Sequence, residues 1–243
     1  MKEGGEKLSF ILQKIKERVK VGVKTKELEE LAQDLIFKAK AKCSFKGYRD
    51  DRENLTPYPN CLCTSINEEI VHVPPSERVL KEGDLLKIDL GIFWKGFHLD
   101  AAITVGVGKI SFEAQRLIRV TKKALKLAIK KAKIGNTFGD IGNTIQRYVE
   151  SQGFNVVREL CGHGIGRELH EEPQILNYGK RKTGEEIKEG MVFCIEPMVV
   201  AGDWRIKRTK DGFGWKTADG SLSCHFEQTI AITKEGPLVL TKF

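Results

Sequence analysis

The sequence predicts an α+β fold with two pseudo-symmetric halves, each of two helices on a curved antiparallel sheet. Two stretches with helical spacing open the chain, β-like stretches follow, and the same order then occurs again. The halves are expected at about residues 1–108 and 109–243, within a single domain spanning 1–243. The length of 243 residues suits one large domain or two moderate ones, so length alone leaves the domain count open.

Two amphipathic helices are expected at the start of the first half. After the break at Gly22, Thr25 is positioned to cap the second of them. From about residue 58 to 107 the pattern becomes β-like, and Lys95-Gly96 is expected to be the turn of a hairpin. Apolar residues at helical spacing mark the first helix: Leu8, Ile11, Leu12, Ile15 and Val19.

The second half is expected to repeat this order. Ser111 can cap a third helix, a fourth follows Gly135, and short strands fill residues 156–240. Residues 19–36 also resemble residues 132–149 when one gap is allowed. Coincidence is the alternative, because a glycine followed by a threonine cap is common. A true repeat would place a site between the halves, with residues drawn from both.

Composition limits the cellular setting and the partners. The first thirty residues lack the apolar core of a signal peptide, and no stretch has the length of a membrane span. We therefore expect a cytoplasmic, monomeric protein without a membrane partner. A net charge of +8 attracts polyanions, which could mean RNA or a ribosome surface. Solvated helix faces explain the lysines equally well, and no DNA partner is expected.

The six cysteines predict no metal or redox motif. They are scattered, and the close pair Cys61-x-Cys63 lacks the spacing of a zinc knuckle or a thioredoxin-like site. We expect all six to be reduced thiols in a cytosol.

Asp89 and Asp100 are the first candidates for chemistry. They lie on the two arms of the hairpin around Lys95-Gly96, eleven residues apart, and an odd separation places both side chains on one face. Two carboxylates on an otherwise apolar strand pair repel each other and lose hydration, unless a cation lies between them. The alternative is that both are exposed charges at an edge or turn.

The second half adds one imidazole and two acids. His163 lies in the glycine-framed run CGHGIGRELHEEP, while Glu196 and Glu227 lie in expected strands. Either glutamate alone could face solvent. Together with Asp89 and Asp100 they form an oxygen-rich set with one nitrogen, suited to two divalent ions such as Mn, Fe(II), Co or Zn.

The other histidines divide into two groups. His72 and His170, like His163, lie in turns bounded by glycine or proline, where a core histidine would be unusual. His98 shares the strand face of Asp100 and could support it, but for His98 and His225 we prefer an ordinary structural role.

Taken together, these residues and their neighbours resemble the type I methionine aminopeptidase family over nearly the whole length of the chain. The motifs that carry the resemblance are SFKGY at 44–48, YPNCLCTSINE at 58–68, GDLLKIDLG at 83–91, GFHLDAA at 96–102, CGHGIGRELHEEP at 161–173, GMVFCIEPM at 190–198 and SLSCHFEQT at 221–229. The resemblance implies the pita-bread fold and metal-dependent removal of the initiator methionine from nascent proteins when the second residue is small.

The resemblance also implies roles for individual residues. Asp89 resembles a ligand of one metal ion, Asp100 and Glu227 resemble carboxylates that bridge both ions, and His163 and Glu196 resemble ligands of the other. His72 and His170 correspond to residues that contact the scissile amide, and Glu196 to the general base. The residues that match the methionine pocket are Tyr48, Tyr58, Cys63, Leu169, Phe213 and, less closely, Phe45.

Departures from the family pattern concern the pocket rather than the ligands. Phe213 replaces a usual tryptophan, Leu169 a usual phenylalanine, and Gln228 a usual histidine, while residues 49–56 are an insertion. Neither the zinc-finger extension nor the long type II insertion is present, so we expect the short bacterial-like form. The alternatives are a proline-specific relative, of the prolidase or aminopeptidase P type, and a non-catalytic pita-bread protein that binds RNA or protein.

Overall fold

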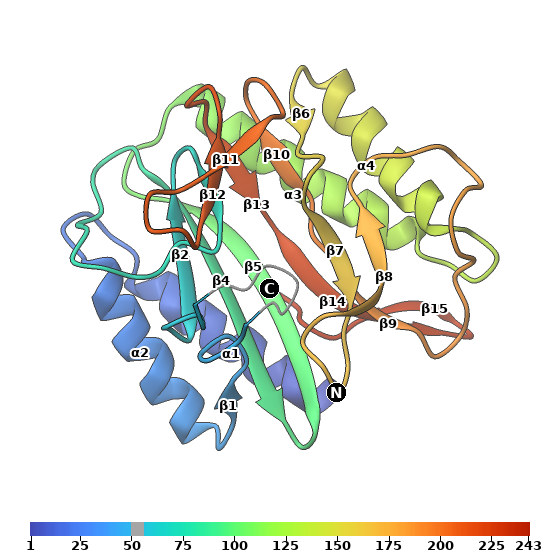
Figure 1. Ribbon diagram of the computed structural model, residues 1–243, viewed down its shortest axis with the longest axis horizontal. Helices are drawn as coiled ribbons and strands as arrows, with labels where there is room; N and C mark the ends of the chain where they lie inside the picture. The colour runs from blue at the N-terminus through green and yellow to red at the C-terminus, as the bar shows by residue number, and fades with distance from the viewer. Residues whose placement is uncertain (50–55) are drawn as a thin grey trace.

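Four helices and a curved antiparallel sheet make up the computed structural model, which describes residues 1–49 and 56–243 (Figure 1). The first two helices precede the central strands and the other two follow them, so the predicted α+β class and element order are confirmed. Their bounds are α1 (Lys2–Arg18), α2 (Thr25–Lys38), α3 (Phe112–Lys131) and α4 (Phe138–Ser151). None of the helices in the described residues is long and apolar enough to cross a membrane.

The strands form one large sheet and two small ones. The large sheet follows the order β1-β4-β5-β14-β9-β7-β8, with β2 added to β4 and β15 added to β14. The small sheets are β13-β10-β6 and β11-β12-β3. The bounds are β1 (Lys42–Cys43), β2 (Leu62–Ile66), β3 (Glu69–Val71), β4 (Leu85–Trp94), β5 (Phe97–Gly106), β6 (Asn155–Val156), β7 (Cys161–Gly164), β8 (Glu171–Leu176), β9 (Val192–Ile195), β10 (Met198–Val200), β11 (Ile206–Arg208), β12 (Trp215–Thr217), β13 (Ser223–His225), β14 (Glu227–Thr233) and β15 (Gly236–Val239).

The β4–β5 hairpin has the predicted turn. Lys95 and Gly96 both have positive φ, at 48° and 86°, as a two-residue type I′ turn requires. The register pairs Asp89 with Ala102 and Gly91 with Asp100. The two aspartates are therefore diagonal neighbours on one face of the sheet, as the odd separation predicts.

Two of the three predicted features of the helix starts are confirmed. Ser111 caps α3 by accepting a hydrogen bond from the Ala114 amide, and α4 follows the left-handed turn at Gly135, at φ 82°. The cap predicted at Thr25 is wrong, because Thr25 is already helical and Lys24 is the cap residue. The Thr25 hydroxyl instead donates to the Ser76 carbonyl oxygen at 3.0 Å, so a tertiary contact takes the place of capping.

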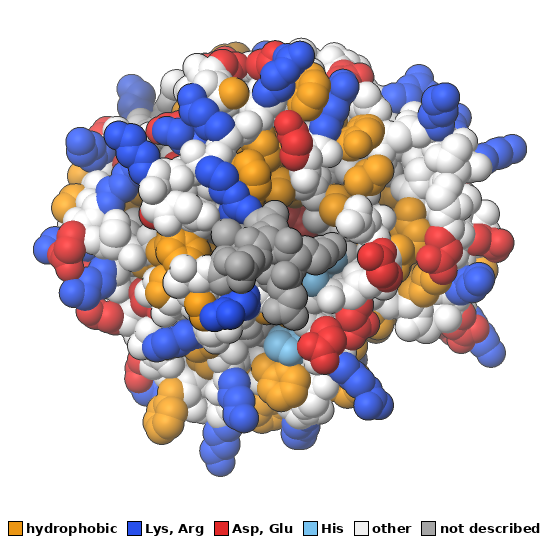
Figure 2. Space-filling view, viewed as in Figure 1, with side chains coloured by type: hydrophobic (Ala, Val, Ile, Leu, Met, Phe, Trp, Pro, Cys, Tyr) orange, Lys and Arg blue, Asp and Glu red, His pale blue; other side chains and the backbone are white. Residues whose placement is uncertain are grey.

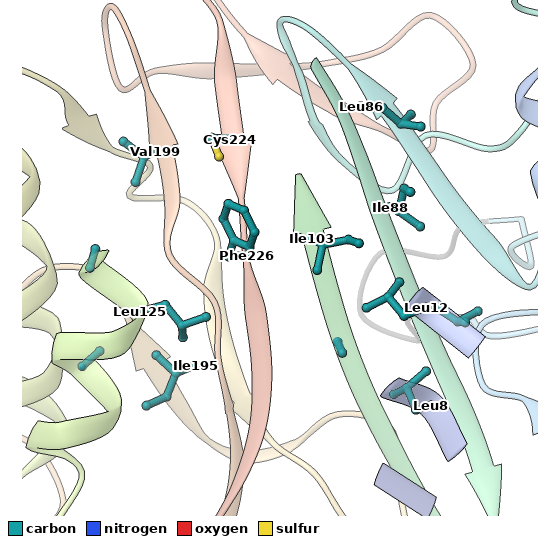
Figure 3. Packing of buried hydrophobic residues seen from close by; sticks show 14 of the residues in the cluster. Leu8, Leu12, Leu86, Ile88, Ile103, Leu125, Ile195, Val199, Cys224 and Phe226 are labelled. Carbon is teal, nitrogen blue, oxygen red and sulfur yellow. The ribbon is translucent and has the colours of Figure 1, made fainter. Parts of the chain in front are cut away.

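The core lies between the helices and one face of the large sheet. Leu8 and Leu12 of α1 belong to the same buried cluster as Ile88 of β4, while Leu125 of α3 lies near Ile195 of β9 (Figure 3). Because side chains alternate along a strand, the residues between the aliphatic ones face the other way. That opposite face holds the acidic residues of the candidate site.

A disulfide joins Cys43 and Cys61, so the expectation of six reduced thiols is wrong for these two. Cys43 pairs with Ile92 on β4, and Leu62, directly after Cys61, pairs with Leu90 on the same strand. The ends of β1 and β2 thus meet along one edge of β4, with Cα atoms 5.2 Å apart. The sequence separation of 18 between the cysteines conceals this proximity. Cys63, Cys161, Cys194 and Cys224 form no disulfide in the described part of the chain.

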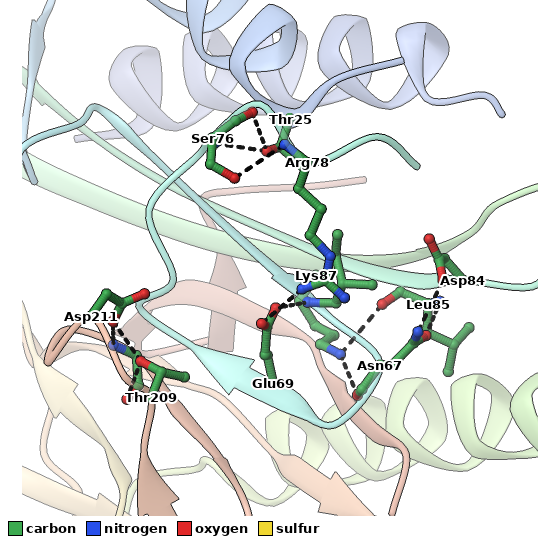
Figure 4. A network of polar contacts seen from close by, with 12 residues as sticks. Thr25, Asn67, Glu69, Ser76, Arg78, Asp84, Leu85, Lys87, Thr209 and Asp211 are labelled. Carbon is green, nitrogen blue, oxygen red and sulfur yellow. Dashed lines mark hydrogen bonds and ion pairs between the residues drawn. The ribbon is translucent and has the colours of Figure 1, made fainter. Parts of the chain in front are cut away.

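The buried side chain of Lys87 connects the first half of the chain to the second. The Lys87 Nζ donates to the Asn67 carbonyl oxygen at 2.8 Å (Figure 4). It also lies 3.4 Å from the carbonyl oxygen of Ser223, which belongs to β13. The Asn67 side chain in turn donates to Asp84. Burial lowers the pKa of Lys87 to about 7.

Candidate functional site

A cavity of about 740 Å³ collects the predicted site residues from both halves of the chain. The view in Figure 2 shows histidine and acidic side chains gathered near the middle of one face. The cavity is lined by the predicted ligands Asp89, Asp100, His163, Glu196 and Glu227, by His72 and His170, and by the predicted pocket residues Phe45, Tyr48, Tyr58, Cys63, Leu169 and Phe213.

Three carboxylates meet at the bottom of this cavity. Asp89, Asp100 and Glu227 each offer one oxygen, and these oxygens lie within 4.8 Å of one another. All three side chains are buried, with at most 6% of the residue exposed. Asp89 Oδ1 and Glu227 Oε1 have no hydrogen-bond partner among the described residues. Unpartnered buried carboxylate oxygens at this separation fit a site for cations.

Burial and mutual repulsion make these acids hard to ionise without a cation. Burial raises the pKa of Asp89 to about 6. The pKa values of Asp100, Glu196 and Glu227 are raised well above the ordinary range, first by burial and then by the charges of neighbouring acids. A divalent ion would reverse this effect, because it stabilises the ionised forms.

His163 presents a nitrogen to the same acids. Its Nδ1 lies 2.9 Å from the Gly164 carbonyl oxygen, an acceptor, so Nδ1 carries the proton of the neutral ring. Its Nε2 lies 3.8 Å from both Glu196 Oε1 and Glu227 Oε1. Burial lowers the pKa of His163 to about 4, which leaves Nε2 with a free lone pair facing two carboxylates. A histidine that binds a metal usually has this arrangement, in which one ring nitrogen donates a hydrogen bond that fixes the tautomer and the other nitrogen faces the metal.

Cys194 also lies near this group. Its sulfur is within 4.8 Å of the candidate donor atoms of His163 and Glu227. Burial, followed by the charge of Glu227, raises the pKa of the thiol well above its usual value, as burial does for the neighbouring acids. The sulfur also lies 3.5 Å from the Thr229 hydroxyl. Four carboxylates and one imidazole already supply the donor set, so Cys194 is not assigned as a ligand.

His225 is a site residue that the sequence analysis did not select. Its Nε2 lies 3.3 Å from Glu196 Oε2, and only 1% of the residue is exposed. Burial lowers its pKa to about 4, so the ring is neutral near pH 7. The sequence feature that could have identified His225 is its position two residues before Glu227, because residues two apart in an extended segment lie on the same side.

His98 lies elsewhere. Its Nδ1 is 2.8 Å from the Ser44 hydroxyl, and its ring is 4.7 Å from that of Phe93. It is not among the described residues that line the cavity. The structural role preferred for His98 agrees with these contacts.

His72 and His170 approach the cavity from different halves. His72 follows β3 directly and has a positive φ of 63°, an uncommon conformation for a non-glycine residue. His170 lies between β7 and β8, with its ring 4.4 Å from that of His163. Its Nδ1 is 2.6 Å from the Tyr48 hydroxyl. The two imidazoles therefore border the acids without belonging to the same strand.

An apolar wall stands beside the acids. Phe45, Tyr58, Cys63 and Leu169 share a buried cluster, and Phe213 packs against it. The rings of Tyr58 and Phe213 meet edge to face at 5.8 Å. Cys63 pairs with Asp89 across β2 and β4, so the wall borders the acids directly. The insertion predicted at 49–56 lies mostly outside the described residues.

Arg208 and Trp215 form another part of the lining that the sequence analysis did not select. The guanidinium lies 4.1 Å from the centre of the Trp215 ring, and Nη1 donates to the Phe213 carbonyl oxygen at 3.2 Å. Neither residue belongs to a quoted motif, and only the fold brings them to the cavity.

The chain resembles known metallopeptidases over almost its full length. Residues 1–234 match metallopeptidase family M24. Methionine aminopeptidase from Clostridium perfringens is 45% identical over 99% of this chain and 94% of its own length. Methionine aminopeptidase 1 from Bacillus subtilis is 43% identical over 100% of this chain and 95% of its own length.

Solved structures agree with the sequence matches. The crystal structure of methionine aminopeptidase from Thermotoga maritima superposes with a TM-score of 0.95 at 42% identity, covering 100% of this chain and 95% of that one. Prolidase from Pyrococcus furiosus has a TM-score of 0.76 at 22% identity, covering 100% of this chain and 63% of that one, and this shows a shared fold alone. The predicted pita-bread fold is confirmed.

Proposed function

The chain belongs to metallopeptidase family M24, and we propose that it is a methionine aminopeptidase that hydrolyses the initiator methionine from nascent proteins whose second residue is small. One observation carries this proposal beyond family membership. A cluster of buried, partly unpartnered acids opens directly onto an apolar wall of aromatic and cysteine side chains within one cavity. Such a wall suits an unbranched thioether.

The donor set fits two divalent cations. By resemblance to the family, Asp89 would hold one ion, His163 and Glu196 would hold the other, and Asp100 and Glu227 would contribute to both. The unpartnered oxygens on Asp89 and Glu227 and the lone pair of His163 support this assignment. Four carboxylates and one imidazole favour Mn, Fe(II), Co or Zn. When bound, such ions lower the pKa of water and polarise a carbonyl group.

The remaining chemistry falls to side chains around the acids. Glu196 accepts the proton released from the attacking water and passes it to the leaving amide nitrogen. His225 lies beside that carboxylate, with Nε2 3.3 Å from Glu196 Oε2, and neither of its ring nitrogens has a hydrogen-bond partner among the described residues. His72 and His170 donate hydrogen bonds to the scissile amide and to the charge that develops on its oxygen.

The apolar wall selects the first residue of the substrate. The side chains that would surround the methionine side chain all line the cavity, and they are Tyr48, Tyr58, Cys63 and Phe213, together with Phe45 and Leu169. In that position Phe213 offers less surface than the tryptophan usual in the family. We therefore propose a pocket with more room at this end.

The substrate also suggests the setting. Nascent chains emerge from ribosomes, so we propose that the protein acts in the cytoplasm as a monomer and associates with ribosomes through its positive surface, which carries a net charge of +8. Salt-dependent co-sedimentation with ribosomes at physiological ionic strength tests the association. Release at ionic strengths far below that value would count against it.

A peptide assay tests the activity and separates it from that of the proline-specific relatives. Met-Ala, Met-Lys and Ala-Pro peptides are incubated with the protein loaded with Mn, Co or Zn, alongside Asp100→Asn. We expect cleavage of Met-Ala, little of Met-Lys, and none by the variant. Cleavage of Ala-Pro without cleavage of Met-Ala would overturn the proposal in favour of the proline-specific relatives.

A further inference from the structure

The Cys43–Cys61 disulfide closes the segment that carries the aromatic part of the apolar wall. Phe45 and Tyr48 follow Cys43, Tyr58 precedes Cys61, and all three line the cavity. Cys63, two residues beyond the bond, lines it as well. The two ends of this wall are therefore joined covalently at the edge of β4.

Non-covalent contacts hold the side of the wall next to Cys61. The buried carboxylate of Glu29 on α2 accepts hydrogen bonds from the amides of Cys61 and Leu62, both at 2.9 Å. The Tyr58 hydroxyl donates to the Leu62 carbonyl oxygen at 3.0 Å. This side is tied to a helix at the start of β2.

The side next to Cys43 is held mainly by contacts of its loop. β1 contributes only the two residues Lys42 and Cys43 to the sheet, and the Ser44 amide donates to the Gly91 carbonyl oxygen at 3.0 Å. The Ser44 hydroxyl lies 2.8 Å from His98 Nδ1, and the Tyr48 hydroxyl lies 2.6 Å from His170 Nδ1. The disulfide therefore connects the end that carries Phe45 and Tyr48, which is held by its own polar contacts, to the end that Glu29 fixes to α2.

We propose that the Cys43–Cys61 disulfide is a positioning element of the methionine pocket, so that its reduction weakens substrate binding while turnover is preserved. This inference rests on the proposed function, because it concerns the same pocket. The bond lies on the wall and not among the acids, and the Tyr48–His170 hydrogen bond is not broken by reduction, so substrate binding should change more than turnover. Reduction by a dithiol or phosphine transfers two electrons and two protons to give two thiols, and the reductant is oxidised.

The size of the effect follows from the freedom that the segment regains. A crosslink over a loop of this length removes many conformations from the unlinked chain. Only part of that freedom returns in the folded protein, because the hydrogen bonds at Ser44, Tyr58 and Glu29 remain. We expect KM for a Met-Ala peptide to rise about five- to tenfold on reduction, with kcat changed by less than about twofold.

The test uses the full chain loaded with Mn, before and after treatment with a phosphine reductant. Alkylation followed by mass spectrometry counts the free thiols, which should number four before and six after reduction. Steady-state kinetics then give KM and kcat for each form. Reoxidation should restore the lower KM.

A matched variant separates the disulfide from other effects of the reductant. Cys43→Ser/Cys61→Ala should have the raised KM without treatment and should not respond to the phosphine. Circular dichroism checks that this variant is folded, and the reduced wild-type protein provides the same comparison if it is not.

Two results would overturn the inference alone. One is an equal KM for proteins with four and six free thiols that both cleave Met-Ala. The other is six alkylated cysteines in the untreated protein. Absence of Met-Ala cleavage by either form would instead remove the proposed function, and the inference with it.

Discussion

The Tyr48 hydroxyl lies 2.6 Å from Nδ1 of His170, although 122 residues separate them in the chain. Their rings also meet edge to face at 4.9 Å. Tyr48 belongs to the apolar wall, and His170 borders the acids from the other half. This contact couples the position of the pocket wall to the orientation of an imidazole proposed to act on the scissile amide.

Tyr48→Phe should lower kcat more than it raises KM. The substitution keeps the ring in the wall but removes the hydroxyl that orients His170, and a hydrogen bond of this kind contributes about 1 kcal/mol, or about fivefold in rate. Steady-state kinetics with Met-Ala peptides measure the change. Tyr58→Phe is the matched control, because its hydroxyl bonds to the Leu62 carbonyl and not to an imidazole. Equal effects of both variants on kcat would contradict this role.

Asp100→Asn should lose bound metal and activity together. Removing a residue that only supports a metal ligand typically lowers metal affinity or activity about 10- to 100-fold. Loss of a carboxylate proposed to bind both ions should therefore lower kcat more than about 100-fold. Metal content by elemental analysis and kcat with saturating Mn give the two readouts. Asp34→Asn removes a carboxylate that is exposed on α2 and should change neither. Full metal content in Asp100→Asn would exclude Asp100 as a ligand.

The acidic face of the sheet could be predicted because side chains alternate between the two faces along each strand. Asp89 and Asp100 share a face once the turn at Lys95-Gly96 is identified. Glu227 pairs with Ala102 and so joins them from β14. Residue type and local pattern made His163 and Glu196 candidates, and the family motifs supported them, but periodicity does not reveal the order of their strands along the sheet.

What the sequence analysis missed depends on contacts between distant segments. Cys43 and Cys61 meet because β1 and β2 share one edge of β4, and Thr25 binds Ser76 rather than capping α2. His225 reaches Glu196 from a short strand that ends just before β14. None of these contacts has a local sequence pattern, so only the packed structure reveals them. The pseudo-repeat of whole halves stays a prediction.

The metal-free protein should lose stability as pH rises above neutrality. The folded-state pKa of Asp89 is about 6, and those of Asp100, Glu196 and Glu227 are raised further, whereas unfolded carboxylates titrate near pH 4. Such acids bind protons more tightly when folded. Their stabilisation is therefore complete below about pH 4 and is lost as pH rises through the folded pKa values.

Comparison with Asp100→Asn isolates this effect from Lys87. The pKa of Lys87 is lowered to about 7, so above that pH the unfolded state binds the extra proton and Lys87 acts in the opposite direction. Both proteins retain Lys87. With EDTA present, we expect the Tm of the wild type to fall relative to the variant as the pH rises above about 6, and Mn to restore it. A parallel Tm in both proteins would contradict the raised carboxylate pKa values.

Phe213→Ala should raise KM for methionyl peptides with little change in kcat. The ring packs edge to face against Tyr58 on the apolar wall and is not one of the candidate metal ligands. Truncating a half-buried aromatic side chain is expected to cost about 1–2 kcal/mol of binding, or about tenfold in KM. Phe37→Ala is a suitable control, since that ring is 81% exposed on α2. A kcat loss without a KM change would place Phe213 in the chemistry rather than in the pocket.

Gly164→Ala should damage the metal site through the backbone. A Cβ at this position would lie 2.2 Å from the Glu172 carbonyl oxygen, so β7 and β8 must separate. His163 immediately precedes this position, and its Nδ1 bonds to the Gly164 carbonyl oxygen. The shift should turn Nε2 away from the acids, and we expect metal affinity and kcat to fall together while Met-Ala binding is less affected.

Gly96→Ala separates this effect from a general loss of stability. Nothing lies within 4 Å of a Cβ at Gly96, but its φ of 86° makes alanine strained by about 1–2 kcal/mol. This variant should have a lower Tm with metal content and kcat intact. If Gly164→Ala lowers Tm by a similar amount and also retains its metal and kcat, the close packing of β7 against β8 is not what directs the His163 imidazole toward Glu196 and Glu227.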